Sequence, residues 1–209
     1  MRRMTWMFAV FLTALMLASC VSAVPEPAKE LSGDGWSGRV VDGSTGQPLP
    51  GALVWIRWST FSPGHSNAET CQHMDLTVTD AEGRFRTPPW RVENPPFAYG
   101  RLSRITEVYL RGYGRTREDR AVQSNPDLLM PPWVGKDVER LEFLAGLRMQ
   151  SFCIGGADAG ADALAAKIHR TLLAEYLQIP GARDRKSLAG SPALPVWEST
   201  IRELEGTRK

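Results

Sequence analysis

The fold is decided by GRVVDGSTGQPLPGALVWI, residues 38–56, and by TVTDAEGRF, residues 77–85. In both stretches apolar residues alternate with polar ones and then stop at clusters of Gly, Pro, Asp and Ser. Alternation with a period of two is typical of half-buried strands, and such clusters mark tight turns. We therefore expect short strands in an antiparallel sandwich, at 36–40, 52–58, 76–79 and 84–87, the last two forming a hairpin.

These stretches resemble the carboxypeptidase regulatory-like domain, whose pattern is a first strand, a TG-x-PL-x-GA turn, a second strand and T-x-TD-x-x-G-x-F. A later strand of that family, which ends in Gly-Tyr, is echoed at 108–113. The resemblance covers about residues 36–115. It implies a mainly β protein with a transthyretin-like, seven-stranded antiparallel β-sandwich, and it implies no activity by itself.

The C-terminal part of the chain has the apolar spacing of helices. Leu164, Ile168 and Leu172 recur every four residues, which predicts a helix over 158–177, and a second helix is expected over 196–204. Residues 124–136 are typical of a proline-bearing connection, and the pattern at 138–147 fits either a strand or a short helix. The expected organisation is a signal peptide at 1–19, a flexible tether at 20–34, the β-sandwich at 35–150 and a helical segment at 151–209.

The first twenty residues, MRRMTWMFAVFLTALMLASC, resemble a bacterial lipoprotein signal, with a charged start, an apolar run and a lipobox ending at Cys20. The run is shorter than the roughly 20 apolar residues that a membrane-spanning helix needs. The resemblance implies cleavage before Cys20 and lipid anchoring through it. Ordinary secretory cleavage after 21–23 is the alternative, and both export the chain. Val21, in place of an aspartate, resembles the outer-membrane pattern, so we expect the periplasmic face of the outer membrane.

Two cysteines remain besides Cys20. Cys71 and Cys153 form an even pair in an exported protein, which predicts a disulfide; two buried thiols are the alternative. Residue types that bind zinc gather around the first of them: His65, Cys71, His73 and Asp75. A cysteine in a disulfide cannot also act as a thiolate ligand, so we expect no metal and no cofactor.

The motifs of zinc peptidases, serine hydrolases and P-loop enzymes are absent from the sequence. No His-x-x-Glu or His-Glu-x-x-His pair occurs, and there is no G-x-S-x-G elbow or phosphate loop. The chain carries 25 basic and 23 acidic residues, a balance that does not favour nucleic acid as a partner. We therefore expect a protein that is not an enzyme.

Tryptophan and arginine supply the candidate binding residues. Trp90 and Trp133 each follow two prolines, where exposed rings would bind a glycan or a polypeptide; burial beneath the loops is the alternative. Arg111 and Arg115 lie in an arginine-rich segment that would meet an anionic surface, or that forms the solvated face of an outer strand. On the second expected strand, Trp55 and Trp58 have opposite parity, so at most one should face the core.

The sequence thus predicts a non-catalytic envelope lipoprotein that acts as a binding or scaffolding module. Its expected partners are the membrane, through the lipid anchor, and an envelope protein or a glycan. A carbohydrate-binding module that uses loop tryptophans is the second hypothesis. A small hydrolase or metal-binding protein is the third, for which no assembled nucleophile, base or ligand set is visible.

Overall fold

A computed structural model describes residues 28–61, 69–95, 102–116, 127–153, 160–183 and 194–206. Within these ranges the chain is mainly β, with eight strands and three helices. The strands are β1 Glu30–Gly33, β2 Ser37–Asp42, β3 Leu53–Phe61, β4 Glu69–Val78, β5 Arg84–Arg86, β6 Trp90–Glu93, β7 Ser103–Tyr109 and β8 Asp127–Met130. The helices are α2 Asp137–Gln150, α3 Ala161–Tyr176 and α4 Leu194–Gly206.

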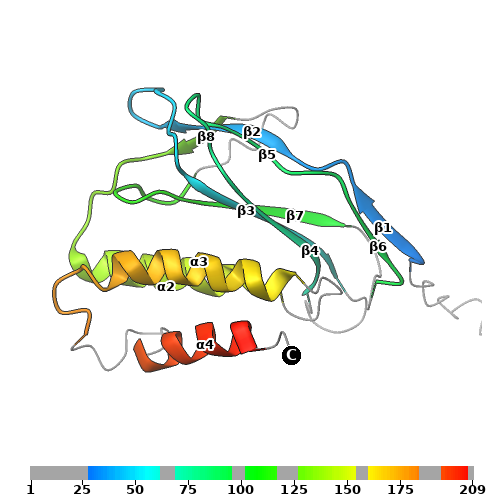
Figure 1. Cartoon of the computed structure of the whole chain (residues 1–209). Coiled ribbons are helices and arrows are strands. Elements are labelled where there is room, and N and C mark those ends of the chain that lie inside the picture. The colour runs from blue at the N-terminus through cyan, green and yellow to red at the C-terminus, as the bar shows by residue number, and fades with distance from the viewer. Residues whose placement is uncertain are drawn as a thin grey trace, which may run out of the picture.

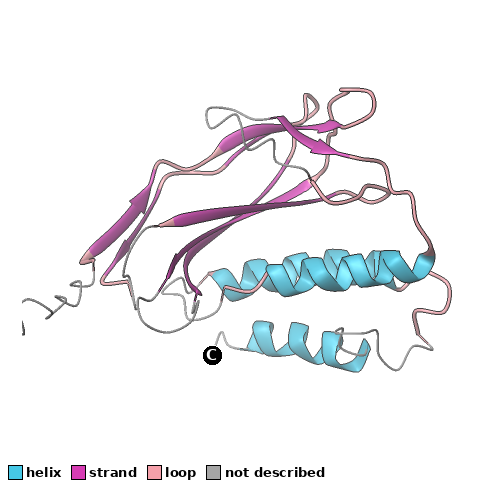
Figure 2. Ribbon diagram, turned by 180° about the vertical axis from the view of Figure 1, so that it is seen from behind, coloured by secondary structure: helices cyan, strands magenta, loops and turns pink. Residues whose placement is uncertain are grey.

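The strands form three small sheets, with the orders β1-β6, β5-β2-β8 and β4-β3-β7. The sheet of β5, β2 and β8 packs on one face of the sheet of β4, β3 and β7, and α2 and α3 cover the other face (Figure 1). Helix α4 packs against α3 as an outer layer, so all the helices lie on one side of the sheets (Figure 2). None of the described helices is long and apolar enough to cross a membrane.

Strands β1, β2, β5 and β6 together form a long antiparallel ribbon. Gly33 lies opposite Trp90 in the first pair, and Ser37 lies opposite Arg86 in the second. Between the two pairs, the backbone N–H of Thr87 donates to the carbonyl of Trp36 at 2.7 Å. The ribbon therefore continues from Glu30 at the start of β1 to Arg39 in β2.

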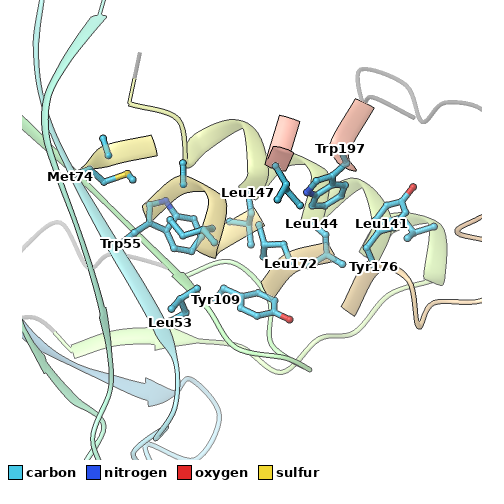
Figure 3. Packing of buried hydrophobic residues seen from close by; sticks show 14 of the residues in the cluster. Leu53, Trp55, Met74, Tyr109, Leu141, Leu144, Leu147, Leu172, Tyr176 and Trp197 are labelled. Carbon is cyan, nitrogen blue, oxygen red and sulfur yellow. The ribbon is translucent and has the colours of Figure 1, made fainter. Parts of the chain in front are cut away.

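The central strand β3 is buried on both faces because it lies between two cores. Trp55, which is 0% exposed, packs with α2 and α3 (Figure 3), whereas Trp58, 5% exposed, packs against the other sheet and β6. The expectation that at most one of these rings faces a core is therefore wrong. It assumed a sheet with a single buried face, and the helical layer supplies a second.

The strand arrangement differs from the predicted seven-stranded antiparallel sandwich. Strand β8 pairs in parallel with β2, in a segment that the sequence pattern presented as a connection. Strand β1 occupies the last part of the predicted flexible tether. Its composition does not predict a strand, and its pairing with β6 holds it in extended form. The expected hairpin at 76–87 is also wrong, because β4 and β5 belong to different sheets and the chain crosses from one to the other at Gly83.

Residues 138–147, for which the sequence pattern fits either a strand or a helix, lie in helix α2. Leu141, Leu144 and Leu147 face the core at helical spacing, and the Glu139 carboxylate accepts the backbone N–H of Lys136 at 2.9 Å, capping the helix start. The other two helices, α3 and α4, lie close to the predicted ranges.

Three contacts tie the end of α2 to the sheet. The Trp55 indole N–H donates to the carbonyl of Gln150 at 3.4 Å, and Arg57 donates to the carbonyl of Phe152 at 2.9 Å. The predicted disulfide between Cys71 and Cys153 is confirmed, with 5.0 Å between the two Cα atoms. The helical segment is thus covalently joined to the β-sheet part.

Candidate anion-binding groove

The predicted tryptophan pair does not form one surface. Trp90 begins strand β6 and is only 7% exposed, with its ring stacked on His73 at 4.8 Å. Trp133 is half-buried in the segment before α2, and its ring packs against Phe143. Figure 1 places β6 and the start of α2 at opposite ends of the molecule, so these two rings cannot hold one ligand together.

The two candidate arginines lie just after β7, at the end of the sheet distant from Trp90. Arg111 is exposed in the turn that follows this strand. Arg115 donates to Glu107 at 2.9 Å and to Gln150 at 2.8 Å, which links β7 to α2. Both hydrogen bonds come from one guanidinium nitrogen of Arg115, and they connect the sheet to the helical layer.

The residues weighed as zinc ligands are only partly described. Cys71 is in the disulfide, His73 Nε2 lies 3.3 Å from Asp75 Oδ2 on β4, and His65 falls outside the described residues, as does Cys20. In the part of the chain that the structure describes, no group of three His, Cys, Asp or Glu side chains is arranged to hold a metal ion.

A buried ion pair joins α2 to α3, and a tyrosine of β7 forms a hydrogen bond to it. Arg140 on α2 donates to both carboxylate oxygens of Glu175 on α3, at 2.7 and 3.0 Å, and the Tyr109 hydroxyl donates to the same carboxylate at 2.6 Å. Burial raises the pKa of Tyr109, and the hydrogen bond to Glu175 adds to the shift. All three polar groups have partners within this network, so no charge is buried unpaired where α2 and α3 pack against the sheet.

A serine and a histidine meet at the end of α2. The Ser151 hydroxyl donates to the carbonyl of Arg148 at 2.7 Å, so the His169 Nε2–H must be the donor in its 2.7 Å contact with Ser151. Burial and, to a smaller extent, the nearby Arg148 charge together lower the pKa of His169 to about 4. The hydroxyl proton is directed at a helix carbonyl, so the pair connects α2 to α3.

An open groove of ≈ 680 Å³ lies across β2, β5, β8 and the turn between β4 and β5. Charged residues dominate its lining: Arg39, Asp80, Arg84, Arg86 and Asp127. Ser37 and Gly38 also line it, and their small size leaves room between the longer side chains.

The strand register places the groove arginines on one face. Arg39 on β2 lies opposite Arg84 on β5 and opposite Asp127 on β8, and Ser37 lies opposite Arg86. Directly paired residues point to the same face of a sheet, and residues two apart on one strand do so as well. Alternate residues of these strands, including Val40 and Phe85, are buried in the core, so the arginines project outward.

The groove carboxylates already have partners. Arg39 donates to both oxygens of Asp127, at 3.0 and 2.6 Å, and this hydrogen bonding lowers the pKa of Asp127. Asp80 Oδ1 accepts the backbone N–H groups of Glu82 and Arg84 and so shapes the turn. Among the described residues, no carboxylate forms an ion pair with Arg84 or Arg86.

Sequence reasoning missed this groove. It considered the arginine-rich segment around Arg111, where the local excess of charge is larger, and overlooked the Arg-x-Arg at 84–86. Alternation alone predicts that Arg84 and Arg86 share the outer face of their strand. The sequence does not predict the pairing of β5 with β2, which brings Arg39 beside these two arginines.

No family model, curated protein or solved structure matches this chain.

Proposed function

We propose that this protein is a non-catalytic, lipid-anchored binding module of the cell envelope, and that the arginine groove is its binding surface. The observation that carries the proposal is the exposed pair Arg84 and Arg86, which has no carboxylate partner among the described residues and stands beside a third arginine, Arg39. Guanidinium groups bind carboxylate and phosphate through paired hydrogen bonds, so an anionic partner suits this surface.

The placing of like charges supports a binding role over a purely structural one. Arg39 and Arg84 are directly opposite each other on neighbouring strands. Like charges in this position destabilise a sheet, whereas opposite charges stabilise it by roughly 0.2–1 kcal/mol. An outer face that served only the fold would gain stability from an acidic residue at position 84.

The position of the groove also fits an anchored protein. In this proposal Cys20 carries the lipid, and the ten residues from Cys20 to Glu30 reach at most ~35 Å when extended. Strand β1 begins at Glu30 and the ribbon continues directly into β2, which lines the groove. The anchor would tether the groove to the membrane through the length of this ribbon.

The β-sheet part is, in our proposal, a variant of the transthyretin-like carboxypeptidase regulatory-like domain. The turn between β2 and β3 supports this, because the Asp42 carboxylate accepts the N–H groups of Ser44 and Thr45, and Gly46 and Gly51 both have positive φ. These are conformations that the TG-x-PL-x-GA motif suits. Strand β8, parallel to β2, is this chain's departure from the antiparallel pattern.

Cross-linking in intact envelopes tests the proposal. The full-length protein, Cys20→Ala and Arg84→Gln/Arg86→Gln are compared with the charge-matched control Arg91→Gln/Arg111→Gln, whose two arginines lie outside the groove. We expect one recurring cross-linked partner with the native protein and the control, and its loss in the other two variants. Recovery that is unchanged in Arg84→Gln/Arg86→Gln would refute the groove as the binding surface.

A further inference from the structure

We propose that the groove binds a phosphorylated saccharide, with the phosphate held by Arg84, Arg86 and Arg39. This inference rests on the proposed binding role of the groove and names the chemistry of its ligand. The arginines are close enough to act together, since opposite residues on paired strands have Cα atoms about 5 Å apart and alternate residues on one strand about 7 Å. All three line the same open groove.

Charge and shape favour phosphate over carboxylate at this place. A carboxylate has two oxygens in one plane and fits a single guanidinium, as Asp127 fits Arg39 with two hydrogen bonds. A phosphate monoester carries about −1.5 to −2 charges at neutral pH and three acceptor oxygens. It therefore matches the two arginines, Arg84 and Arg86, that have no ion-pair partner among the described residues, and its third oxygen can face Arg39.

The groove is larger than a phosphate group and is not uniformly basic. Its ≈ 680 Å³ lies within the usual range of small-ligand sites, about 300–1,000 Å³. Asp80 and Asp127 line it beside the arginines, and their carboxylate oxygens are acceptors for hydroxyl groups. A ligand that combines a phosphate with several hydroxyl groups, which is a phosphorylated sugar, uses both kinds of residue.

The acidic residues also argue against a simple polyanion. With Asp80 and Asp127 both ionised, the five charged groups of the lining sum to a formal charge of only +1. A ligand that offered anionic groups alone would be repelled by the two carboxylates, whereas hydroxyl groups would be accepted by them.

Calorimetric titration of the full-length protein in detergent tests the inference with glucose 1-phosphate, glucose, glucuronate and inorganic phosphate as probes. We expect glucose 1-phosphate to bind at least tenfold more tightly than each of the others. Arg84→Gln/Arg86→Gln should weaken this binding at least tenfold, and Arg91→Gln/Arg111→Gln should leave it within twofold. Glucuronate that binds as tightly as glucose 1-phosphate would overturn the choice of phosphate.

The pH dependence of glucose 1-phosphate affinity is a second measurement. It would not change if the groove arginines had only a structural role. The second pKa of a phosphate monoester is about 6, whereas arginine does not titrate in this range, so affinity should rise several-fold from pH 5 to pH 7.5. Binding of glucuronate should stay nearly constant over the same range because its carboxylate is ionised throughout. A flat profile for glucose 1-phosphate would contradict recognition of the dianion.

Vesicles that carry the same chemical group distinguish a lipid headgroup from a free sugar phosphate as the ligand. Neutral phosphatidylcholine vesicles with and without a lipid that has a phosphorylated glucosamine headgroup are compared by sedimentation with the Cys20→Ala protein, which lacks the proposed acylation site. Retention that depends on Arg84 and Arg86 indicates a lipid headgroup, and binding to the soluble sugar phosphate alone indicates a free metabolite; either supports the inference. Loss of all sugar-phosphate binding while envelope cross-linking still needs Arg84 and Arg86 would overturn this inference and leave the proposed function standing.

Discussion

Arg39 on β2 and Arg84 on β5 lie directly opposite each other on the outer face of the ribbon. Of these two arginines, Arg39 has a carboxylate partner among the described residues and Arg84 has none. This pairing places uncompensated positive charge at a fixed point of a rigid sheet. Two like charges opposite each other lower the stability of a sheet. A substitution that removes one of them should therefore raise stability and weaken ligand binding.

Replacing Arg84 by threonine should raise stability slightly and weaken ligand binding. Arg84→Thr removes the like charge opposite Arg39 and adds a residue that favours strands, for an expected gain of about 0.5 kcal/mol in the free energy of unfolding. Urea denaturation measures the change. The matched change Arg91→Thr removes an arginine that pairs with Glu30 at 2.7 Å, so it should give no gain. A loss of stability in Arg84→Thr that exceeded the loss in Arg91→Thr would contradict the charge argument.

The disulfide should make a large contribution to stability. Cys71 and Cys153 are 82 residues apart, and the chain-entropy model predicts about 4.5 kcal/mol for a loop of that length. The Cys71→Ala/Cys153→Ala variant should lower the denaturation midpoint strongly. Thiol titration of the unreduced Cys20→Ala protein should find no free thiol before reduction and two afterwards, whereas two free thiols at the start would contradict the bridge.

Breaking the buried ion pair should be worse than removing it. Glu175→Gln leaves the Arg140 charge without its carboxylate and should cost about 3 kcal/mol in the free energy of unfolding. The double variant Arg140→Met/Glu175→Leu removes both charges and should cost clearly less. Equal or larger destabilisation in the double variant, measured by the same denaturation, would show that the charges themselves stabilise the packing.

Acid should destabilise the helical layer through His169. Its pKa is about 4 when folded and near 6.5 when unfolded, so the unfolded chain binds the proton more readily. Its contribution to stability is complete above pH 6.5 and is lost as the pH falls toward 4, by about 3 kcal/mol in all. His169→Gln should flatten the pH dependence in this window, and a slope equal to that of the native protein would exclude His169 as its cause.

Local pattern predicted much of the fold because several strands are fixed by their own residues. Alternation in 38–56 gives β2 and β3, and helical spacing gives α3 and α4. Strands β1, β6 and β8 were missed because pairing with distant segments creates them: β1 and β6 order each other, and β2 orders β8. None of the three has a long apolar alternation of its own.

The same distinction explains the candidate site. The disulfide followed from counting two cysteines in a chain that the sequence predicts to be exported, which needs no geometry. The groove depends on Arg39, Arg84 and Asp127 meeting across three strands, and no local signal carries that register. The tryptophans Trp55 and Trp58 were misplaced for a related reason, since a second core can be seen only when the helices are placed against the sheet.

Side-chain NMR of the arginine Nε–H groups during titration with glucose 1-phosphate tests the groove as a binding site. We expect saturable shifts of Arg84 and Arg86, with a smaller shift of Arg39 because it also holds Asp127. No change is expected at Arg111 or Arg115, which lie outside the groove. Shifts confined to those two arginines, or no saturable shift in the groove at all, would show that the groove does not bind the ligand.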